Sequence, residues 1–424
     1  MYIVRAWLGR SVPMAKAAVA AAVAVSISGF NLKGEEMSYG EAKQFLERHT
    51  KVVELADGDA HVAVCPEWQG RVMTSTCGGP GGSSFGFIHR EFIESGRPDA
   101  HFNNYGGEDR LWLSPEGGQF SLWFAPGAEQ NLDNWFTAPA MNEGAFKIRG
   151  EPSGRSCRMG RRMKLQNASA TQFKLGVTRE VRLLDVDDLA ESFGRPAAEL
   201  VAVPAVKKVG YETVNAITNR GEPMSKEKGL VSIWMLGMMN AAAETVVIVP
   251  YKQGDESELG PVVKSDYFGE VPAERLKITP EAILFRGDGE FRSKIGTSER
   301  RAKNVLGSID FGSGTLTLVH FTMPDDPDKH DYMNNMWELP QAEPYTGDVA
   351  NSYNDGPPAP GKKGLGAFYE IESLSPAVAL AAGESLTHRH RTLHVQADPA
   401  TLARLARLAL GVDLESVRRE MFGR

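Results

Sequence analysis

The chain of 424 residues is mildly acidic, with a net charge of −7 and a pI of about 5.8. Nucleic-acid binding needs a sustained positive surface, so these values exclude nucleic acid as the expected partner. Hydrophobic residues make up 42% of the chain and charged residues 24%, which allows a large buried core and one globular domain.

The N-terminal residues have the layout of a secretory signal peptide. Three basic residues precede the uncharged run 17–30, and Ser26 and Ser28 supply the small residues of a cleavage site. The run is too short for a comfortable membrane span. We expect residues 1–28 to be removed and the protein to be periplasmic or secreted, without a membrane anchor. An Ala-rich helix of a cytosolic protein is the alternative.

A short helical segment is expected at residues 29–52. Ser38 and Glu41 have the spacing of a capping box, which predicts a helix to about His49.

Residues 53–396 have a different sequence pattern from the N-terminal region. Short apolar or alternating runs, rich in β-branched and aromatic residues, are separated by Gly, Asp, Asn and Pro. This pattern predicts a large antiparallel β-sandwich. The expected strands lie at 61–65, 71–77, 119–125, 146–150, 173–184, 210–219, 230–236, 244–251, 315–323, 367–374 and 385–395.

Two further helices are predicted after the first one. A short helix is expected near 187–193, and an amphipathic helix from Pro399 to Met421 fills most of a C-terminal segment, 397–424, that packs on the same domain. The fold class is therefore all-β with a few short helices and a C-terminal helix.

The three cysteines do not form a disulfide framework in a chain of this length. Buried free thiols are the expected state of Cys65, Cys77 and Cys157, and one bridge between Cys65 and Cys77 is the alternative.

Polar and aromatic residues are concentrated in three segments, 101–119, 332–356 and 370–394. Aromatic rings stack on sugar rings, while amides, carboxylates and guanidinium groups hydrogen-bond sugar hydroxyls. We expect the segments to meet on one concave face that binds a mono- or oligosaccharide. The expected binding residues are Asn103, Asn104, Glu108, Asp109, Arg110, Trp337, Glu338, Asn351, Tyr353, Asn354, Asp355 and His388.

Two carboxylates in one strand are the strongest catalytic candidates. Glu370 and Glu372 are two residues apart, so both side chains point to the same face. Two carboxylates on a buried face raise each other's pKa, which favours a functional role for at least one of them.

Three histidines follow on another expected strand. His388, His390 and His394 share one parity, and the first two have the His-x-His spacing of a weak metal-site candidate. A polar rim of a sugar site or a solvent-exposed face is the alternative. No metal and no other cofactor is expected.

Four stretches of the sequence carry a family resemblance: GGEDRLWLSPEGGQFSLWF (106–124), GDGEFRSKIG (287–296), GDVANSYNDGPP (347–358) and FYEIESLSPAVALAAGESLTHRH (368–390). The chain resembles the galactose mutarotase-like superfamily, which includes the aldose 1-epimerases, and within it an uncharacterised family of secreted bacterial proteins. The resemblance implies the β-supersandwich fold of that group.

The resemblance also implies catalytic roles. In the epimerases a Glu takes the proton of the anomeric hydroxyl and a His protonates the ring oxygen. Glu370 or Glu372 occupies the stretch comparable to the base. His101 begins the segment HFNNY (101–105), which loosely resembles an epimerase His motif. His320 is the other candidate for the acid.

The expected function is therefore acid–base chemistry at or near a sugar anomeric centre, either epimerisation or glycosidic cleavage. A non-catalytic carbohydrate-binding protein is the first alternative. A metal-dependent sugar lyase or isomerase that uses His388 and His390 is the second.

Overall fold

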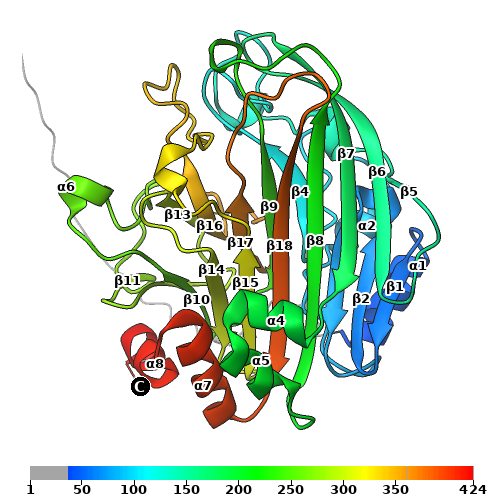
Figure 1. Cartoon of the computed structure of the whole chain (residues 1–424), viewed down its shortest axis with the longest axis vertical. Coiled ribbons are helices and arrows are strands. Elements are labelled where there is room, and N and C mark those ends of the chain that lie inside the picture. Colours follow the sequence, from blue (N-terminus) through cyan, green and yellow to red (C-terminus); the bar gives the residue numbers. More distant parts are fainter. Residues whose placement is uncertain (1–36, 360, 424) are drawn as a thin grey trace, which may run out of the picture. The chain divides into compact units, whose positions relative to one another are not determined.

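Three antiparallel β-sheets form the framework of residues 37–359 and 361–423, the part of the chain described by the computed structural model (Figure 1). The expected signal peptide, residues 1–28, lies outside the described residues. The described part of the chain belongs to one compact unit, and none of its helices is long and apolar enough to cross a membrane.

The largest sheet has ten strands, and β18 lies at its centre between β15 and β8 (Figure 1). Neighbouring strands pair antiparallel throughout, with β18 and β8 in register over twelve residue pairs from Ser385 opposite Thr218 to Gln396 opposite Lys207. In spatial order the strands are β11 (Leu276–Ile278), β12 (Ala282–Arg286), β10 (Thr245–Pro250), β14 (Val305–Asp310), β15 (Thr315–Phe321), β18 (Ser385–Gln396), β8 (Lys207–Asn219), β7 (Gln172–Leu183), β6 (Ser156–Gln166) and β5 (Lys147–Ile148).

A five-stranded sheet packs against the ten-stranded sheet. Its order is β13 (Ser293–Ser298), β16 (Asp348–Asn354), β17 (Phe368–Leu374), β9 (Ser232–Asn240) and β4 (Arg110–Ser114). The third sheet is small, with β1 (Val53–Asp57), β2 (Ala60–Cys65) and β3 (Arg71–Thr76). Alternate residues of β17 face the ten-stranded sheet, where Ile371 packs with Val319 and Phe321 of β15. We call this side of the five-stranded sheet its inner face and the opposite side its outer face.

Helices cover one end of the ten-stranded sheet on the side away from the five-stranded sheet (Figure 1). There Leu316 and Leu318 of β15 meet Leu405 of the C-terminal region in one apolar cluster. The described α-helices are α1 (Tyr39–Glu47), α2 (Arg90–Ser95), α3 (Pro139–Asn142), α4 (Val186–Phe193), α5 (Arg195–Ala202), α6 (Glu256–Leu259), α7 (Pro399–Leu410) and α8 (Leu414–Phe422). Single 3₁₀ turns occur at Pro66–Trp68, Leu132–Asn134, Lys226–Lys228 and Pro327–Lys329.

The predicted sandwich and first helix are confirmed, and Ser38 and Glu41 form the expected capping box. The single helix expected over 399–421 is wrong, because Gly411 at φ 73° caps α7 and ends it before α8 begins. The strand expected at 119–125 is also wrong. Trp123 and Phe124 are buried there in irregular structure, so their apolar run reflects packing rather than a strand. All three cysteines are buried and free, as expected.

Candidate functional site

The side chains of β17 divide between the two faces of the five-stranded sheet. Glu370 and Glu372 lie on the outer face, and Ile371 and Ser373 lie on the inner face. The prediction that the two carboxylates share one face is confirmed, because successive residues of a strand point to opposite sides.

Glu370 is held by Arg110 from β4. Nη2 of Arg110 donates to Oε1 of Glu370 at 2.7 Å, and both side chains are almost fully buried. The guanidinium also stacks on the ring of Trp112 at 4.1 Å. Burial raises the pKa of Glu370 to about 7, against the lowering effect of Arg110 and together with the negative charge of Glu372. The carboxyl of Glu370 is therefore set to exchange its proton near neutral pH.

Glu372 is fully buried and pairs with a lysine. Lys294 of β13 lies 3.0 Å from its Oε2, and Nε1 of Trp234 donates to the same oxygen at 2.8 Å. The other oxygen, Oε1, is buried without a hydrogen-bond partner in the described structure. The charge of Glu372 counters desolvation at Lys294 and keeps the pKa of the ammonium raised.

A third carboxylate, Glu116, lies within the electrostatic reach of this pair. Nε1 of Trp135 donates to its Oε1 at 2.8 Å. Burial raises the pKa of Glu116, while Lys294 acts in the opposite direction. We call the set Arg110, Glu116, Lys294, Glu370 and Glu372 the charged cluster. The set holds three carboxylates and two cations, and the positive charge of Arg292 also acts on Glu116.

Sequence reasoning missed three members of this arrangement as site residues. Lys294 stands in the stretch 287–296 and Glu116 in the stretch 106–124, both of which carry the family resemblance. Trp234 lies in an apolar strand whose sequence predicts only a place in the hydrophobic core. A lysine within a buried strand, as in residues 293–298, is the signal that could have indicated a partner carboxylate.

Of the expected binding residues, Asn351 and Tyr353 flank the charged cluster on β16. They lie opposite Glu372 and Glu370 respectively. The hydroxyl of Tyr353 donates to Asp355 at 2.7 Å, and Nδ2 of Asn351 lies 3.5 Å from the hydroxyl of Tyr267. These residues lie where the prediction places them, beside the carboxylates.

Other expected residues lie in the loops. His101 stacks on Phe136 at 4.0 Å, and its Nδ1 lies 2.6 Å from the backbone oxygen of Trp135, the residue that contacts Glu116. Asn103 and Asn104 make backbone contacts, with Asn142 and Leu365 respectively. Trp337 packs edge-to-face on Phe124 at 5.1 Å, and Glu338 is exposed.

Glu108 and Asp109 turn away from the charged cluster, although Arg110 directly follows them. Oε1 of Glu108 lies 3.0 Å from Nε2 of His394 of the ten-stranded sheet, and Asp109 pairs with the buried Arg179. The expectation that both side chains lie beside Arg110 and bind sugar there is wrong, because they point into the interior of the sandwich.

Asn354 also lies on the wrong side for the predicted site. It pairs with Tyr369 on the inner face, and its amide contacts Asp288 at 3.2 Å and the backbone of Gly289 and Phe291. The predicted convergence of Glu108, Asn354 and Glu372 on one face is therefore corrected. Asn354 is three residues from Asn351, so strand alternation separates them.

The three histidines of β18 share one face, as predicted, and that face is the interior of the sandwich. Oγ of Ser373 lies 2.8 Å from both Nε2 of His388 and Nδ1 of His390. Burial lowers the pKa of His388 to about 3, with a further contribution from His390. His388 thus does not line the outer face with the carboxylates. The described residues contain no group of three or more His, Cys, Asp or Glu side chains placed to hold a metal.

His320 lies on the far side of the ten-stranded sheet. It packs edge-to-face on Phe193 of α4 at 6.1 Å, and Nε2 lies 2.9 Å from the amide of Asn304. Its neighbours on the same face of β15, Leu316 and Leu318, pack under the helices. The five-stranded and the ten-stranded sheet thus both lie between Glu370 and His320, so the expected pairing of these two residues across one sugar is not supported by their positions.

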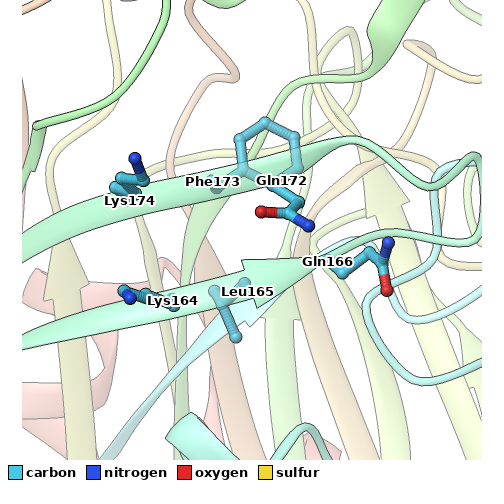
Figure 2. Close-up of a pocket in the computed structure, with 6 residues that line it drawn as sticks. All are labelled: Lys164, Leu165, Gln166, Gln172, Phe173 and Lys174. Atoms are coloured by element: carbon cyan, nitrogen blue, oxygen red, sulfur yellow. The ribbon is translucent and has the colours of Figure 1, made fainter.

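A surface hollow lies away from the charged cluster. Figure 2 shows it at the paired ends of β6 and β7, with a volume of about 230 Å³. It is lined by Lys164, Leu165, Gln166, Gln172, Phe173 and Lys174. Neither a carboxylate nor an imidazole is among these residues, so the hollow lacks the proton-transferring groups of the cluster.

A family model, Family of unknown function (DUF6786), matches residues 37–421. The chain therefore belongs to this family. A search of curated proteins gives no match.

Solved structures with similar chain traces share little sequence with this protein. A candidate aldose 1-epimerase from Escherichia coli K12 is 11% identical, with a TM-score of 0.47 over 82% of this chain and 99% of its own. The Slr1438 protein from Synechocystis sp. PCC 6803 is 10% identical, with a TM-score of 0.45 over 81% and 96%. A galactose mutarotase-like protein from Lactobacillus casei is 9% identical, with a TM-score of 0.40 over 82% and 99%.

Proposed function

We propose that this member of DUF6786 binds a carbohydrate over the outer face of the five-stranded sheet and transfers protons to and from it. Glu370 is the proton-transferring base, and Glu116 is the second group that carries a proton. The single observation that carries the proposal is the buried carboxyl of Glu370, whose pKa is raised to about 7 within hydrogen-bonding distance of Arg110.

The composition of the charged cluster supports acid–base chemistry. An efficient general base or acid has a pKa near the working pH, and burial raises the pKa of both Glu370 and Glu116. Glu372 has a different environment, because one of its oxygens contacts both Lys294 and Nε1 of Trp234. Neighbouring carboxyl groups in unequal environments are the arrangement that separates acid from base.

The surroundings of the cluster support a sugar as the ligand. Asn351, Tyr353 and Tyr267 supply amide and hydroxyl groups beside the carboxylates. Trp135 supplies an aromatic ring next to Glu116. Sites for neutral polar ligands combine ring faces with a few hydrogen-bonding groups in this way.

The test is the variant Glu370→Gln, assayed against a panel of mono- and oligosaccharides for anomer interconversion and for glycosidic cleavage. Loss of a general base costs about 10² to 10⁴ in rate. A carboxamide oxygen still accepts a hydrogen bond from Arg110, so sugar affinity and melting temperature are expected to change far less than the rate.

The matched control is Glu281→Gln, which makes the same change at an exposed carboxylate outside the cluster. It is expected to keep the wild-type rate. Wild-type turnover in Glu370→Gln, with a sugar that the protein demonstrably binds, would remove Glu370 from the chemistry.

A non-catalytic carbohydrate-binding protein is the second candidate. The observation that favours it is that both β17 carboxylates already form ion pairs, Glu370 with Arg110 and Glu372 with Lys294. If the protein only binds carbohydrate, the wild type is expected to bind a sugar of the same panel without turning it over. Glu370→Gln is then expected mainly to lower the affinity for that sugar.

A further inference from the structure

An arginine that forms no ion pair with any described residue lies at the β13 side of the charged cluster. Arg292 directly precedes β13, and its guanidinium stacks on the ring of Phe268 at 3.8 Å from the ring centre. Phe268 is 41% exposed, and its ring packs edge-to-face on Tyr353 at 5.9 Å. The stack therefore connects a solvent-accessible ring directly to a residue that flanks Glu370.

The charge of Arg292 is not neutralised by any residue that the structure describes. Two nearby carboxylates already have other partners: Asp288 pairs with Arg275 and Arg286, and Asp355 accepts from the hydroxyl of Tyr353 and the backbone N–H of Gly366. A guanidinium carries five N–H donors in one plane, so Arg292, stacked on Phe268 and hydrogen-bonded to Tyr353, still has donors for an external acceptor.

Arg292 is also close enough to act on the cluster. Its positive charge lowers the pKa of Glu116, and a hydrogen bond from it lowers the pKa of Tyr353 against the larger effect of burial. Tyr353 lies between Lys294 and Glu370 across the sheet, opposite each of them. An oxyanion held by Arg292 would thus belong to the same ligand that contacts Glu370.

We propose that Arg292 and Phe268 form a subsite for an oxyanion, so that the ligand of this protein is an acidic sugar, carrying a carboxylate or a phosphate group. This inference rests on the proposed function, since it names the substrate class of the same site. Arginine suits both groups, because its planar fork donates two parallel hydrogen bonds to a carboxylate or a phosphate. Phe268 fixes the plane of that fork and offers its own exposed part to a sugar ring.

The experiment measures the affinity of the full chain for matched sugars by titration calorimetry or ligand-observed NMR. Two series are used: D-glucose with D-glucuronate and D-glucose 6-phosphate, and D-galactose with D-galacturonate and D-galactose 6-phosphate. We expect at least one acidic sugar to bind about 10- to 100-fold more tightly than its neutral parent, the usual effect of hydrogen bonds to a charged group. The preference between uronate and phosphate identifies the oxyanion.

Three variants assign that preference to the subsite. Arg292→Gln is expected to remove it, Arg292→Lys to restore it only in part, and Phe268→Ala to reduce it. The control Lys174→Gln removes one positive charge from β7 of the other sheet, at the hollow in Figure 2, and is expected to keep the preference. Melting temperatures confirm that each variant is folded.

The outcomes separate this inference from the proposed function. Equal affinity for neutral and acidic sugars, no measurable binding of either, or a preference that survives in Arg292→Gln overturns the subsite. In the first and last of these cases, turnover that depends on Glu370 leaves the proposed function standing. A preference that disappears in Arg292→Gln, with no turnover of any sugar, upholds the subsite and overturns the catalytic proposal alone.

Discussion

The ammonium of Lys294 and the carboxylate of Glu372 lie 3.0 Å apart, with side-chain exposures of 7% and 0%. Breaking a buried ion pair by removing one partner costs about 3–5 kcal/mol, because the remaining charge is left without compensation. We therefore predict that Lys294→Met lowers the free energy of unfolding by about this amount, measured by urea denaturation. Lys303→Met, at an exposed position, is the control.

The double variant Lys294→Met/Glu372→Gln tests the physical reason. It removes the stranded charge but keeps an acceptor for Nε1 of Trp234. We expect it to be more stable than Lys294→Met alone. A double variant that is as unstable as the sum of its two single variants would show that the ion pair is not the cause.

The pH dependence of turnover should follow Glu370. The base works when it is ionised, so the rate is expected to rise with pH through about 7 and then level off, as far as this group is concerned. The negative charge of Asp355 contributes to the raised pKa of Glu370. Asp355→Asn is thus predicted to move the midpoint to lower pH. A midpoint that is the same in both proteins would argue against Glu370 as the titrating group.

The buried His388 predicts acid sensitivity of the fold. Its pKa is about 3 in the folded protein against 6.5 for the free side chain, so the unfolded chain binds the additional proton between these values. Stability from this group is complete above about pH 6.5 and is lost as the pH falls towards 3, by on the order of 5 kcal/mol. Glu370, with a raised pKa, changes stability in the opposite direction between 4.5 and about 7.

The variant His388→Gln isolates this effect, because the contribution of Glu370 is common to both proteins. It is expected to lose less stability than the wild type between pH 6.5 and pH 4, in unfolding curves recorded at fixed ionic strength. Parallel pH profiles for the two proteins would contradict the prediction.

Export is the last prediction, and it concerns residues outside the described structure. The signal-peptide layout predicts a mature chain that begins near Gly29. N-terminal sequencing of protein from a native-type host checks it. An intact Met1 in the periplasmic or secreted fraction would count against cleavage.

Which side chains of a strand share one face can be predicted from the sequence. Alternation along 368–374 is enough to place Glu370 and Glu372 on one face, and the same rule applied to 351–354 separates Asn354 from Asn351. Alternation alone is therefore sufficient to predict the inner-face position of Asn354. Glu108 is different, because the chain enters β4 from irregular structure and alternation does not hold before Arg110.

The partners of the carboxylates lie beyond sequence reasoning. Lys294 is 78 residues from Glu372, and Arg110 is 260 residues from Glu370. These contacts depend on the order and register of five strands, which a single sequence does not determine. His320 was misplaced for the same reason, since nothing in the sequence assigns the face of β15 that points to the helices.

The outermost strands of the ten-stranded sheet are its shortest. β5 has 2 residues and β11 has 3, whereas β18 at the centre has 12. An exposed strand edge is a template for pairing with another chain, and its strength grows with the number of unpaired N–H and C=O groups. Each of these two outermost strands presents only a few such groups of its own. Addition of another chain to β5 or β11 is thus disfavoured, even though the sheet between them is wide.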